Sequence, residues 1–230
     1  MILTVCANPS VDSFWNFGHI QKGTTNRSAG ESFYPGGKGI HTALALNELG
    51  QEVTALGIWG GQTGQWLKEQ CLDRQIQPIG PHVAEWTRIC ITNKSTTDWN
   101  ETELIGGGPS LAKRDVQKFK AIFRQGLADP KPEAITIGGS VPGGMPENSY
   151  HDLITQAKSV NLPVFLDASG QLLKKALPAH PYAIHINREE GKSLCGKDDP
   201  SVIARWLSDH CTIAAVTAGA EGLYMQYEDE

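Results

Sequence analysis

Polar and glycine-rich segments follow several short apolar runs along the 230-residue sequence. They supply carboxylates, amides, hydroxyls and permissive backbone, which together can hold a small polar ligand or a phosphate. Five such segments are "NPSVD" (8–12), "GGSVPGG" (138–144), "DASG" (167–170), "NREE" (187–190) and "TAGAEG" (217–222). Any one of them could be a turn, because these residues also favour turns. Their shared position after apolar runs predicts one common site.

A further segment, "GGKG" at 36–39, places a lysine among three glycines ahead of an amphipathic stretch. Two nucleotide-binding patterns are absent from the sequence: G-x-x-x-x-G-K-[ST], and G-x-G-x-x-G after the first apolar run. The loop therefore belongs to neither a P-loop enzyme nor a dinucleotide-binding protein of that type.

The elements that must position these segments alternate along the chain. Short apolar runs predict strands at 2–6, 53–58, 134–138, 163–167, 182–186 and 212–217. Helical spacing predicts helices at 38–49, 63–74, 113–127, 148–160, 171–177, 188–194 and 201–209, with Thr63 as a candidate cap. This alternation predicts an α/β fold with a mostly parallel sheet covered on both faces. Ligands of such sheets bind beyond the carboxyl ends of the strands.

Two polar regions, about 13–34 and 86–104, interrupt the alternation and contain short runs such as "RICITN". We expect antiparallel strands there that extend from the main sheet as a lid. With no internal repeat or long linker, residues 1–230 are predicted to form one α/β domain that carries these two lid segments.

Composition excludes several classes. The chain is 40% hydrophobic and 20% charged, which is typical of a soluble globular protein, and its net charge of −5 argues against a general nucleic-acid binder. No apolar stretch approaches the ~18 residues of a membrane helix. The five cysteines form no CxxC pair, no Cys/His cluster suggests zinc, and the N-terminus does not resemble a signal peptide, so we expect a cytoplasmic protein.

Eight ordered segments resemble the PfkB-type carbohydrate kinases, most closely the 1-phosphofructokinase and tagatose-6-phosphate kinase branch. They are "NPSVD", "NRSAGESFYPGGKGIHTALALNELG", "TRICI", "TELIGGGP", "GGSVPGGMPENSY", "LDASGQLLKKAL", "INREE" and "TAGAEGLYM". The resemblance implies a ribokinase-like three-layer α/β/α sandwich with a small β-lid. It also implies ATP- and Mg²⁺-dependent phosphorylation of a sugar phosphate of the fructose 1-phosphate, fructose 6-phosphate or tagatose 6-phosphate class.

The resemblance implies roles on the sugar side of the site. Asp12 would accept hydrogen bonds from sugar hydroxyls, Ser140 would contact the sugar, and Arg88, helped by Arg27, would bind the substrate phosphate. The loop residues expected to face the sugar are Gly36, Gly37, Lys38, Gly39 and His41. The residues alone also allow plainer roles: Asp12 and Ser140 as caps of turns, Arg88 as a surface arginine of the lid, and Lys38 as a solvated charge.

The nucleotide side would be formed by His185, Asn187, Thr217, Gly219 and Gly222. Glu190 would lie near Mg²⁺ and bind it through water, which suits an ion that keeps several waters. The same N-x-x-E spacing at 187–190 also predicts a helix N-cap with a carboxylate in the first turn, and both interpretations can hold together.

Three departures from the family pattern affect these roles. His41 stands where the family usually has asparagine, and His185 stands where it usually has lysine. The family's G-A-G-D motif, whose aspartate is the general base, does not occur in this sequence, so no catalytic residue is identified. The chain is then either a fragment of a kinase or a natural short form, and the acidic "YEDE" ending favours a fragment.

Two alternative functions stay open. One is a sugar-phosphate-binding protein without activity, and the other is a kinase for an unphosphorylated sugar or nucleoside. By analogy with related kinases, we also expect a homodimer that forms through the lid.

Overall fold

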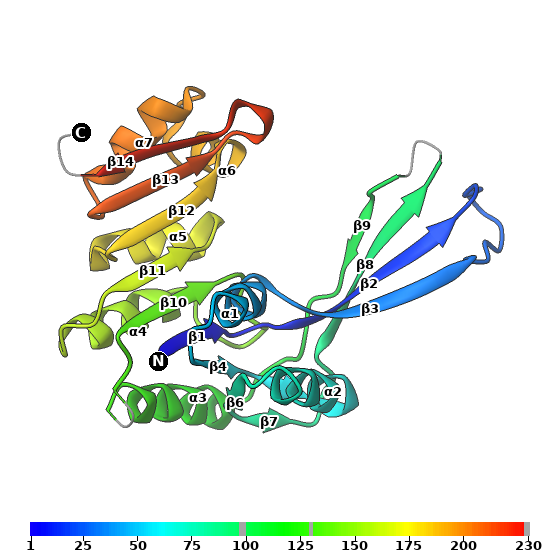
Figure 1. The fold of residues 1–230 in the computed structure, drawn as a ribbon, viewed down its shortest axis with the longest axis horizontal. Helices are drawn as coiled ribbons and strands as arrows, with labels where there is room; N and C mark the ends of the chain where they lie inside the picture. The colour runs from blue at the N-terminus through cyan, green and yellow to red at the C-terminus, as the bar shows by residue number, and fades with distance from the viewer. Residues whose placement is uncertain (97–99, 129–130, 228–230) are drawn as a thin grey trace.

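The computed structural model describes residues 1–96, 100–128 and 131–227 of the chain. Residues 97–99 of the second expected lid segment and the last three residues of "YEDE" lie outside the described residues. Eight strands form the main sheet (Figure 1). In spatial order they are β14 (Leu223–Tyr227), β13 (Ile213–Thr217), β12 (Ala183–Asn187), β11 (Val164–Asp167), β10 (Ala134–Gly138), β1 (Ile2–Cys6), β4 (Val53–Gly57) and β6 (Gln77–Ile79).

All neighbouring strands of this sheet are parallel except β13 and β14, which pair antiparallel. Parallel pairing with an unbroken strand order brings the carboxyl ends of β1 and β10–β13 to one edge of the sheet. At that edge Gly138 pairs with Asp167, and Asn187 pairs with Thr217. The strand-end segments singled out in the sequence therefore meet in space.

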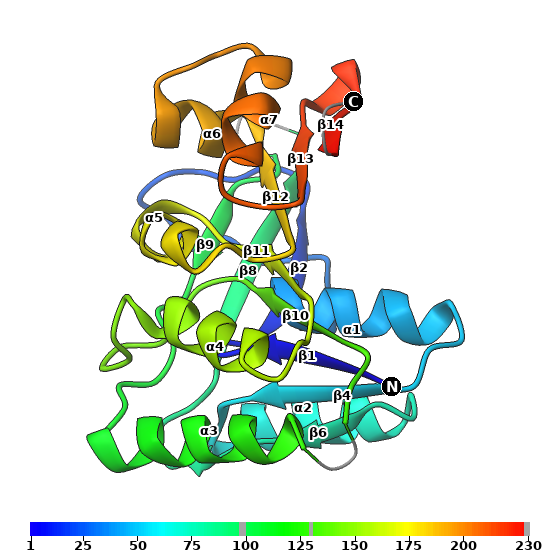
Figure 2. The ribbon, with the colours of Figure 1, turned by 90° about the vertical axis from the view of Figure 1, so that its left-hand side faces the viewer.

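Helices cover the sheet on both sides (Figure 2). They are α1 (Lys38–Glu48), α2 (Gly61–Leu72), α3 (Lys113–Gly126), α4 (Ser149–Lys158), α5 (Gly170–Ala176), α6 (Arg188–Cys195) and α7 (Pro200–Ser208), with short 3₁₀ turns η1 (Leu177–Ala179) and η2 (Gly219–Glu221). One buried cluster joins the sheet to α3, α4, α5 and α7, and a second joins it to α1 and α2. Leu3 and Val5 belong to the first cluster and Cys6 to the second, because successive strand residues point to opposite faces.

A second sheet extends away from the main body as the lid (Figure 1). Its strands, in spatial order, are β3 (Gly30–Gly36), β2 (Ser10–Phe17), β8 (Arg88–Ser95) and β9 (Glu103–Ile105). The outer pairs are antiparallel, as expected, but the central strands β2 and β8 run parallel. Both central strands leave the main body in the same direction, and β3 and β9 make the return, so antiparallel pairing at the centre is impossible.

The register of the lid places polar residues at its base. Ser10 pairs with Gly36 on one side and with Arg88 on the other, and Asp12 pairs with Tyr34 and Cys90. A third, two-stranded sheet of β5 (Trp59–Gly60) and β7 (His82–Val83) lies next to α2.

The predicted cap of α2 is wrong. The N-cap is Gly60, and the Thr63 hydroxyl instead lies 2.9 Å from the Thr87 carbonyl oxygen and 3.3 Å from that of Gly60, with one proton to donate between them. The five cysteines are free thiols, and burial raises the pKa of Cys6 and Cys71 to about 11, as expected for packing residues. Within the described part of the chain, every helix is too short or too polar to span a bilayer.

Candidate active site

Two adjoining hollows lie where the lid joins the carboxyl edge of the main sheet. The first, here called the lid cleft, has a volume of about 580 Å³ and includes Asp12, His41, Arg88 and Thr92 in its wall. The second has a volume of about 480 Å³ and reaches toward Ser140 and the loop after β11. Lys38 and Arg88 line both hollows, so these two cations stand at the junction.

Asp12 faces the lid cleft from β2 and is held by two neighbours. The Ser10 hydroxyl donates to Asp12 Oδ1 at 2.7 Å, and His41 Nε2 lies 3.2 Å from Asp12 Oδ2. Ser10 and Asp12 share a face of β2 because strand residues two apart do. His41 comes from the first turn of α1, so the pair links the lid to the helix after the "GGKG" loop.

The two charges of this pair shift each other's titration. Burial raises the pKa of Asp12, but the hydrogen bonds from His41 and Ser10, with the charges of His41 and Arg88, outweigh burial and lower that pKa overall. The hydrogen bond with Asp12 raises the pKa of His41, against a smaller lowering by burial. The imidazole therefore holds a proton to higher pH than an isolated histidine does.

Contacts within the protein explain the glycines of the "GGKG" loop. A Cβ on Gly36 would lie 2.1 Å from Asp12 Cγ, and one on Gly39 would lie 2.5 Å from the Val5 carbonyl oxygen. Gly37 has φ +97°, and a Cβ there would lie 2.9 Å from Cys6 Sγ. These glycines let the loop pack on β1 and the Asp12 carboxylate. Their approach to a sugar stays a prediction.

Arg88 begins β8 and reaches the junction of the two hollows. Its Nε donates to the Asn8 carbonyl oxygen at 3.2 Å, which is the only hydrogen bond of its guanidinium within the described residues. The two terminal nitrogens therefore have donors left for a ligand. Ser140 lines the second hollow, and its Oγ accepts a hydrogen bond from Asn8 Nδ2 at 3.2 Å.

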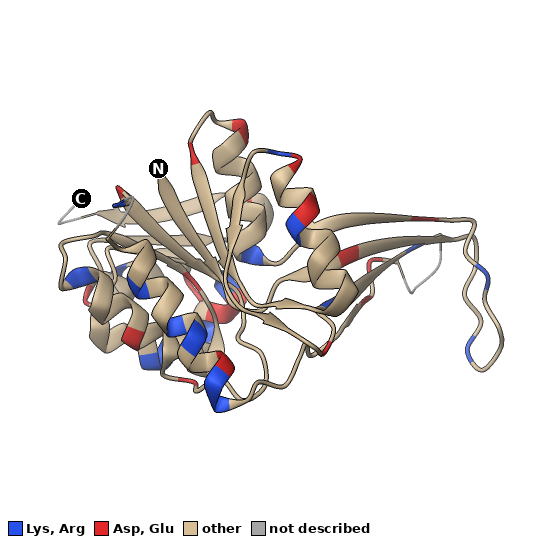
Figure 3. Ribbon diagram, turned by 90° about the horizontal axis from the view of Figure 1, so that it is seen from below, with Lys and Arg blue, Asp and Glu red and all other residues tan. Residues whose placement is uncertain are grey.

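Arg27 is not brought to this site. It is exposed in the connection between β2 and β3, at the far tip of the lid, and it lies in the wall of neither hollow. That tip carries basic residues, whereas the base of the lid lies next to both acidic and basic segments (Figure 3).

Lys38 is a partly exposed charge that forms two ion pairs. Its Nζ donates to Asp167 Oδ1 at 2.7 Å and to Glu190 Oε1 at 3.4 Å. Partial burial lowers the pKa of Lys38, but the hydrogen bond and charge of Asp167 and the charge of Glu190 outweigh that effect and raise it. The lysine thus spans the carboxyl ends of two strands, β11 and β12.

His185 binds the other oxygen of the same aspartate. Its Nδ1 lies 3.2 Å from Asp167 Oδ2, and its Nε2 lies 3.5 Å from Thr217 Oγ1. The contact with Asp167 raises the pKa of His185, and Asp167 keeps a lowered pKa although burial acts in the opposite direction. We call the group Lys38, Asp167, His185 and Glu190 the strand-end cluster.

The N-x-x-E segment forms a capping box at the start of α6. Asn187 Oδ1 accepts from the Glu190 backbone N–H at 2.8 Å, and Glu190 Oε2 accepts from the Asn187 N–H at 2.9 Å. Thr217 ends β13 beside this box. Gly219 and Gly222 lie in the turn that follows, with φ +58° and +94° and no heavy atom within 4 Å of an added Cβ.

Two residues of the site, Asp167 and Asn8, were not identified from the sequence. Both occur in quoted strand-end segments, "DASG" and "NPSVD", but the sequence does not tell which strand ends are neighbours. The strand order β10–β11–β12 places Asp167 beside His185, and the lid places Asn8 beside Arg88.

Three carboxylates at the carboxyl edge are engaged by protein groups. Asp12, Asp167 and Glu190 each have both oxygens in contact with a donor or cation. A hydrogen-bonded carboxylate with a lowered pKa is a weak general base, so neither Asp12 nor Asp167 suits that role. In the described chain, no three His, Cys, Asp or Glu side chains are grouped closely enough to hold a metal ion by themselves.

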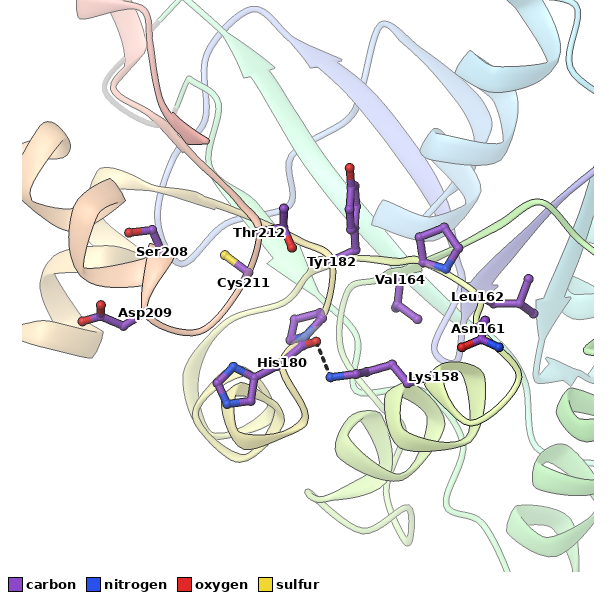
Figure 4. A pocket seen from close by; sticks show the side chains of 12 residues that line it. Lys158, Asn161, Leu162, Val164, His180, Tyr182, Ser208, Asp209, Cys211 and Thr212 are labelled. Atoms are coloured by element: carbon purple, nitrogen blue, oxygen red, sulfur yellow. Dashed lines mark hydrogen bonds between the residues drawn. The ribbon is translucent and has the colours of Figure 1, made fainter. Parts of the chain in front are cut away.

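A third hollow, of about 540 Å³, lies at the opposite, amino ends of β11–β13 (Figure 4). Lys158 lines it, but the Lys158 ammonium donates to the carbonyls of Ala179 and His180 at 2.9 and 3.0 Å. This hollow shares no lining residue with the lid cleft. The paired charges and the unfilled guanidinium donors therefore mark the carboxyl edge as the candidate site.

Comparison with known proteins identifies the family and the fold. The family model described as pfkB family carbohydrate kinase matches residues 7–230. The structure of phosphofructokinase-2 from Escherichia coli in complex with fructose-6-phosphate is similar at TM-score 0.88 and 23% identity, covering 100% of this chain and 77% of that chain. A Thermotoga maritima protein named "Possible 1-phosphofructokinase" is similar at TM-score 0.85 and 24% identity, covering 98% of this chain and 76% of that chain.

Proposed function

The chain belongs to the pfkB family of carbohydrate kinases, which are ATP-dependent phosphotransferases, and we propose that its substrate is a sugar that already carries a phosphate. The substrate class is that of fructose 1-phosphate, fructose 6-phosphate and tagatose 6-phosphate. The observation that carries this proposal is Arg88, which lines the lid cleft and whose guanidinium makes one hydrogen bond, from Nε, among the described residues.

An arginine in this state suits a phosphate. The guanidinium presents parallel donors that match two phosphate oxygens, and these charge-assisted bonds are stronger than neutral ones. The Asn8 carbonyl fixes one edge of the guanidinium plane, which lowers the entropy lost when a phosphate binds. The unphosphorylated sugar or nucleoside alternative leaves these donors unused.

The sugar would lie between Asp12, His41 and Ser140. Asp12 accepts from its neighbours through only one lone pair on each oxygen, so each oxygen can also accept from a sugar hydroxyl. The Ser140 hydroxyl can donate, because its oxygen already accepts from Asn8. His41, in place of the usual asparagine, keeps the Asp12 carboxylate oriented toward the lid cleft.

The nucleotide side is proposed to lie beside the strand-end cluster. Asp167 and Glu190 offer the oxygen donors that Mg²⁺ prefers, and with Lys38 between them they fit an ion that binds through water. Mg²⁺ bound there would neutralise charge on the phosphates of ATP. His185 and Thr217 adjoin this cluster, and Gly219 and Gly222 leave space for a nucleotide.

The proposal assigns no general base among the described residues. A second candidate function follows from this: binding of a sugar phosphate without turnover. It is favoured by one observation, that Asp12, Asp167 and Glu190 are engaged by protein groups.

The two functions are separated by one assay. Incubation of the protein with Mg·ATP and each of the three sugar phosphates should give ADP and a bisphosphate with at least one of them. Calorimetric titration of the same three ligands accompanies it. Binding without product supports the second function, whereas neither binding nor product contradicts both.

The expected homodimer remains a proposal. Apolar lid side chains support it, since Phe33, Leu104 and Ile105 are between 52% and 63% exposed. Sedimentation of the wild-type protein should therefore give twice the chain mass of 24.9 kDa, and a monomer at micromolar concentration would refute it.

A further inference from the structure

Asn8 lies where three segments of the candidate site meet. Its Nδ2 donates to the Gly107 carbonyl at 3.1 Å and to Ser140 Oγ at 3.2 Å, and its own carbonyl accepts from Arg88 Nε at 3.2 Å. The side chain is buried, with 4% exposure. Asn8 thus contacts three segments: the segment that follows β9, the start of β8, and the loop after β10.

These contacts set what two other residues can offer a ligand. Because Asn8 donates to Ser140 Oγ, the Ser140 proton is left to donate toward the second hollow. The backbone of that loop is held separately, since the Tyr150 hydroxyl contacts the carbonyls of Gly139 and Ser140 at 3.1 and 3.2 Å. Asn8 therefore governs the direction of the Ser140 hydroxyl rather than the path of its backbone.

The side-chain oxygen of Asn8 shows how closely residues 106–108 pack against Asn8. Asn8 Oδ1 is buried and has no hydrogen-bond partner within the described residues. Gly108, at φ +88°, passes so close that a Cβ there would lie 2.3 Å from Oδ1. Enclosing an acceptor without a partner is costly, so this arrangement is sensitive to small displacements of 106–108.

We propose that Asn8 is a positioning residue that couples the lid to the substrate-contacting groups. When residues 106–108 move with the lid, the side-chain amide of Asn8 transmits the shift to the Ser140 hydroxyl. The backbone carbonyl of Asn8 transmits it to Arg88. The coupling rests on the proposed function, because it assumes that Ser140 and Arg88 contact the sugar phosphate. A purely structural asparagine would stabilise the fold without linking these two groups.

The test uses Asn8→Asp, which keeps the shape but removes both side-chain donors. The Ser140 hydroxyl must then donate to the new carboxylate and is withdrawn from the substrate. We expect about tenfold weaker binding of fructose 6-phosphate, by calorimetry, and faster amide exchange in 106–110 and 138–143 together. Asn47→Ala, in the last turn of α1, controls for loss of an asparagine.

Asn8→Ala and Ser140→Ala extend the test to a double-mutant cycle. If Asn8 acts through Ser140, replacing Asn8 weakens binding less in the Ser140→Ala background than in the wild-type background. Additive losses, or faster exchange spread over the whole chain, would overturn the coupling.

The exchange measurement needs no ligand, so it separates this inference from the proposed function. If the wild type binds no sugar phosphate, the proposed function fails. The coupling is then supported if amide exchange in 106–110 and in 138–143 changes together in Asn8→Asp, and it is contradicted if only one segment changes.

Discussion

The lid cleft and the strand-end cluster lie side by side, yet their charges are arranged differently. In the lid cleft, the two terminal guanidinium nitrogens of Arg88 have no hydrogen-bond partner among the described residues, and the Asp12 carboxylate pairs with His41. In the strand-end cluster, Lys38 and His185 share the Asp167 carboxylate, and Lys38 also reaches Glu190.

The difference separates two kinds of binding. A phosphate that enters the lid cleft can bind guanidinium donors of Arg88 that have no partner among the described residues. A ligand of the strand-end cluster must compete with contacts that the protein already makes. The substrate phosphate should therefore bind with little rearrangement, whereas Mg²⁺ must displace or share the partners of Lys38.

Removal of the unfilled donors should give the largest effect. Arg88→Ala loses a bidentate, charge-assisted contact, worth about 1.5 kcal/mol or more per hydrogen bond, so affinity for fructose 6-phosphate should fall about 100-fold. Arg88→Lys should recover only part of this loss, because an ammonium lacks the fork. Calorimetry checks both variants, with Arg114→Ala on α3 as control. Unchanged affinity in Arg88→Ala would remove Arg88 from the site.

Crowding at the base of the lid should give the second-largest effect. In Gly36→Ala the new Cβ would lie 2.1 Å from Asp12 Cγ, so the carboxylate or the strand must move. We expect a loss of about 1–3 kcal/mol in the free energy of unfolding, measured with urea. Gly30→Ala, at the other end of β3, has no heavy atom within 4 Å of the added Cβ and should be near neutral. Equal stability of the two variants would show that Asp12 does not require Gly36.

Lys38→Met tests whether a cation holds the strand-end cluster together. The variant leaves Asp167 and Glu190 without their shared ammonium, and it should lose about 1 kcal/mol of stability in EDTA, since Lys38 is 43% exposed and partly screened. Millimolar Mg²⁺ should restore part of that loss by replacing the ammonium.

Lys94→Met, which breaks a lid pair with Glu101, is the matched control and should show no such recovery. If Mg²⁺ stabilises neither variant, Asp167 and Glu190 are not the metal-binding carboxylates.

The smallest effect should be the pH dependence of the Asp12–His41 pair. The pKa of His41 is raised on folding, so its contribution to stability is full below the unfolded pKa of about 6.5 and is lost as pH rises through the folded pKa. More than half of the side chain is exposed, so the difference between wild type and His41→Asn should stay below about 1 kcal/mol.

Urea unfolding of both proteins between pH 5 and pH 9 measures this difference directly. His82→Asn, at an exposed histidine outside the site, controls for the substitution itself. A difference that grows with pH would contradict the assigned pair.

Much of the main sheet could be predicted from the sequence, because buried parallel strands are continuous apolar runs and each is followed by a helix. The lid was harder. Its strands mix polar and apolar residues, so hydrophobicity does not fix their register. The parallel pairing of β2 with β8 follows only from how both strands leave the main body.

The family resemblance placed Asp12, Arg88 and Lys38 at the candidate site, and the structure brings all three to the lid cleft, where their contacts with a substrate stay a prediction. Asp167 and Asn8 were missed because their importance depends on which strand ends are neighbours. The reason for the glycines also came only from the structure: they are crowded by Asp12, Cys6 and Val5.

The central claim is that the lid cleft is built for a phosphate already on the sugar. Calorimetric titration of the wild-type protein with fructose 6-phosphate and with fructose, under the same conditions, tests it most directly. The unfilled donors of Arg88 predict that the phosphorylated sugar binds at least about 100-fold more tightly. Equal affinity for the two ligands would contradict the account and would favour an unphosphorylated substrate.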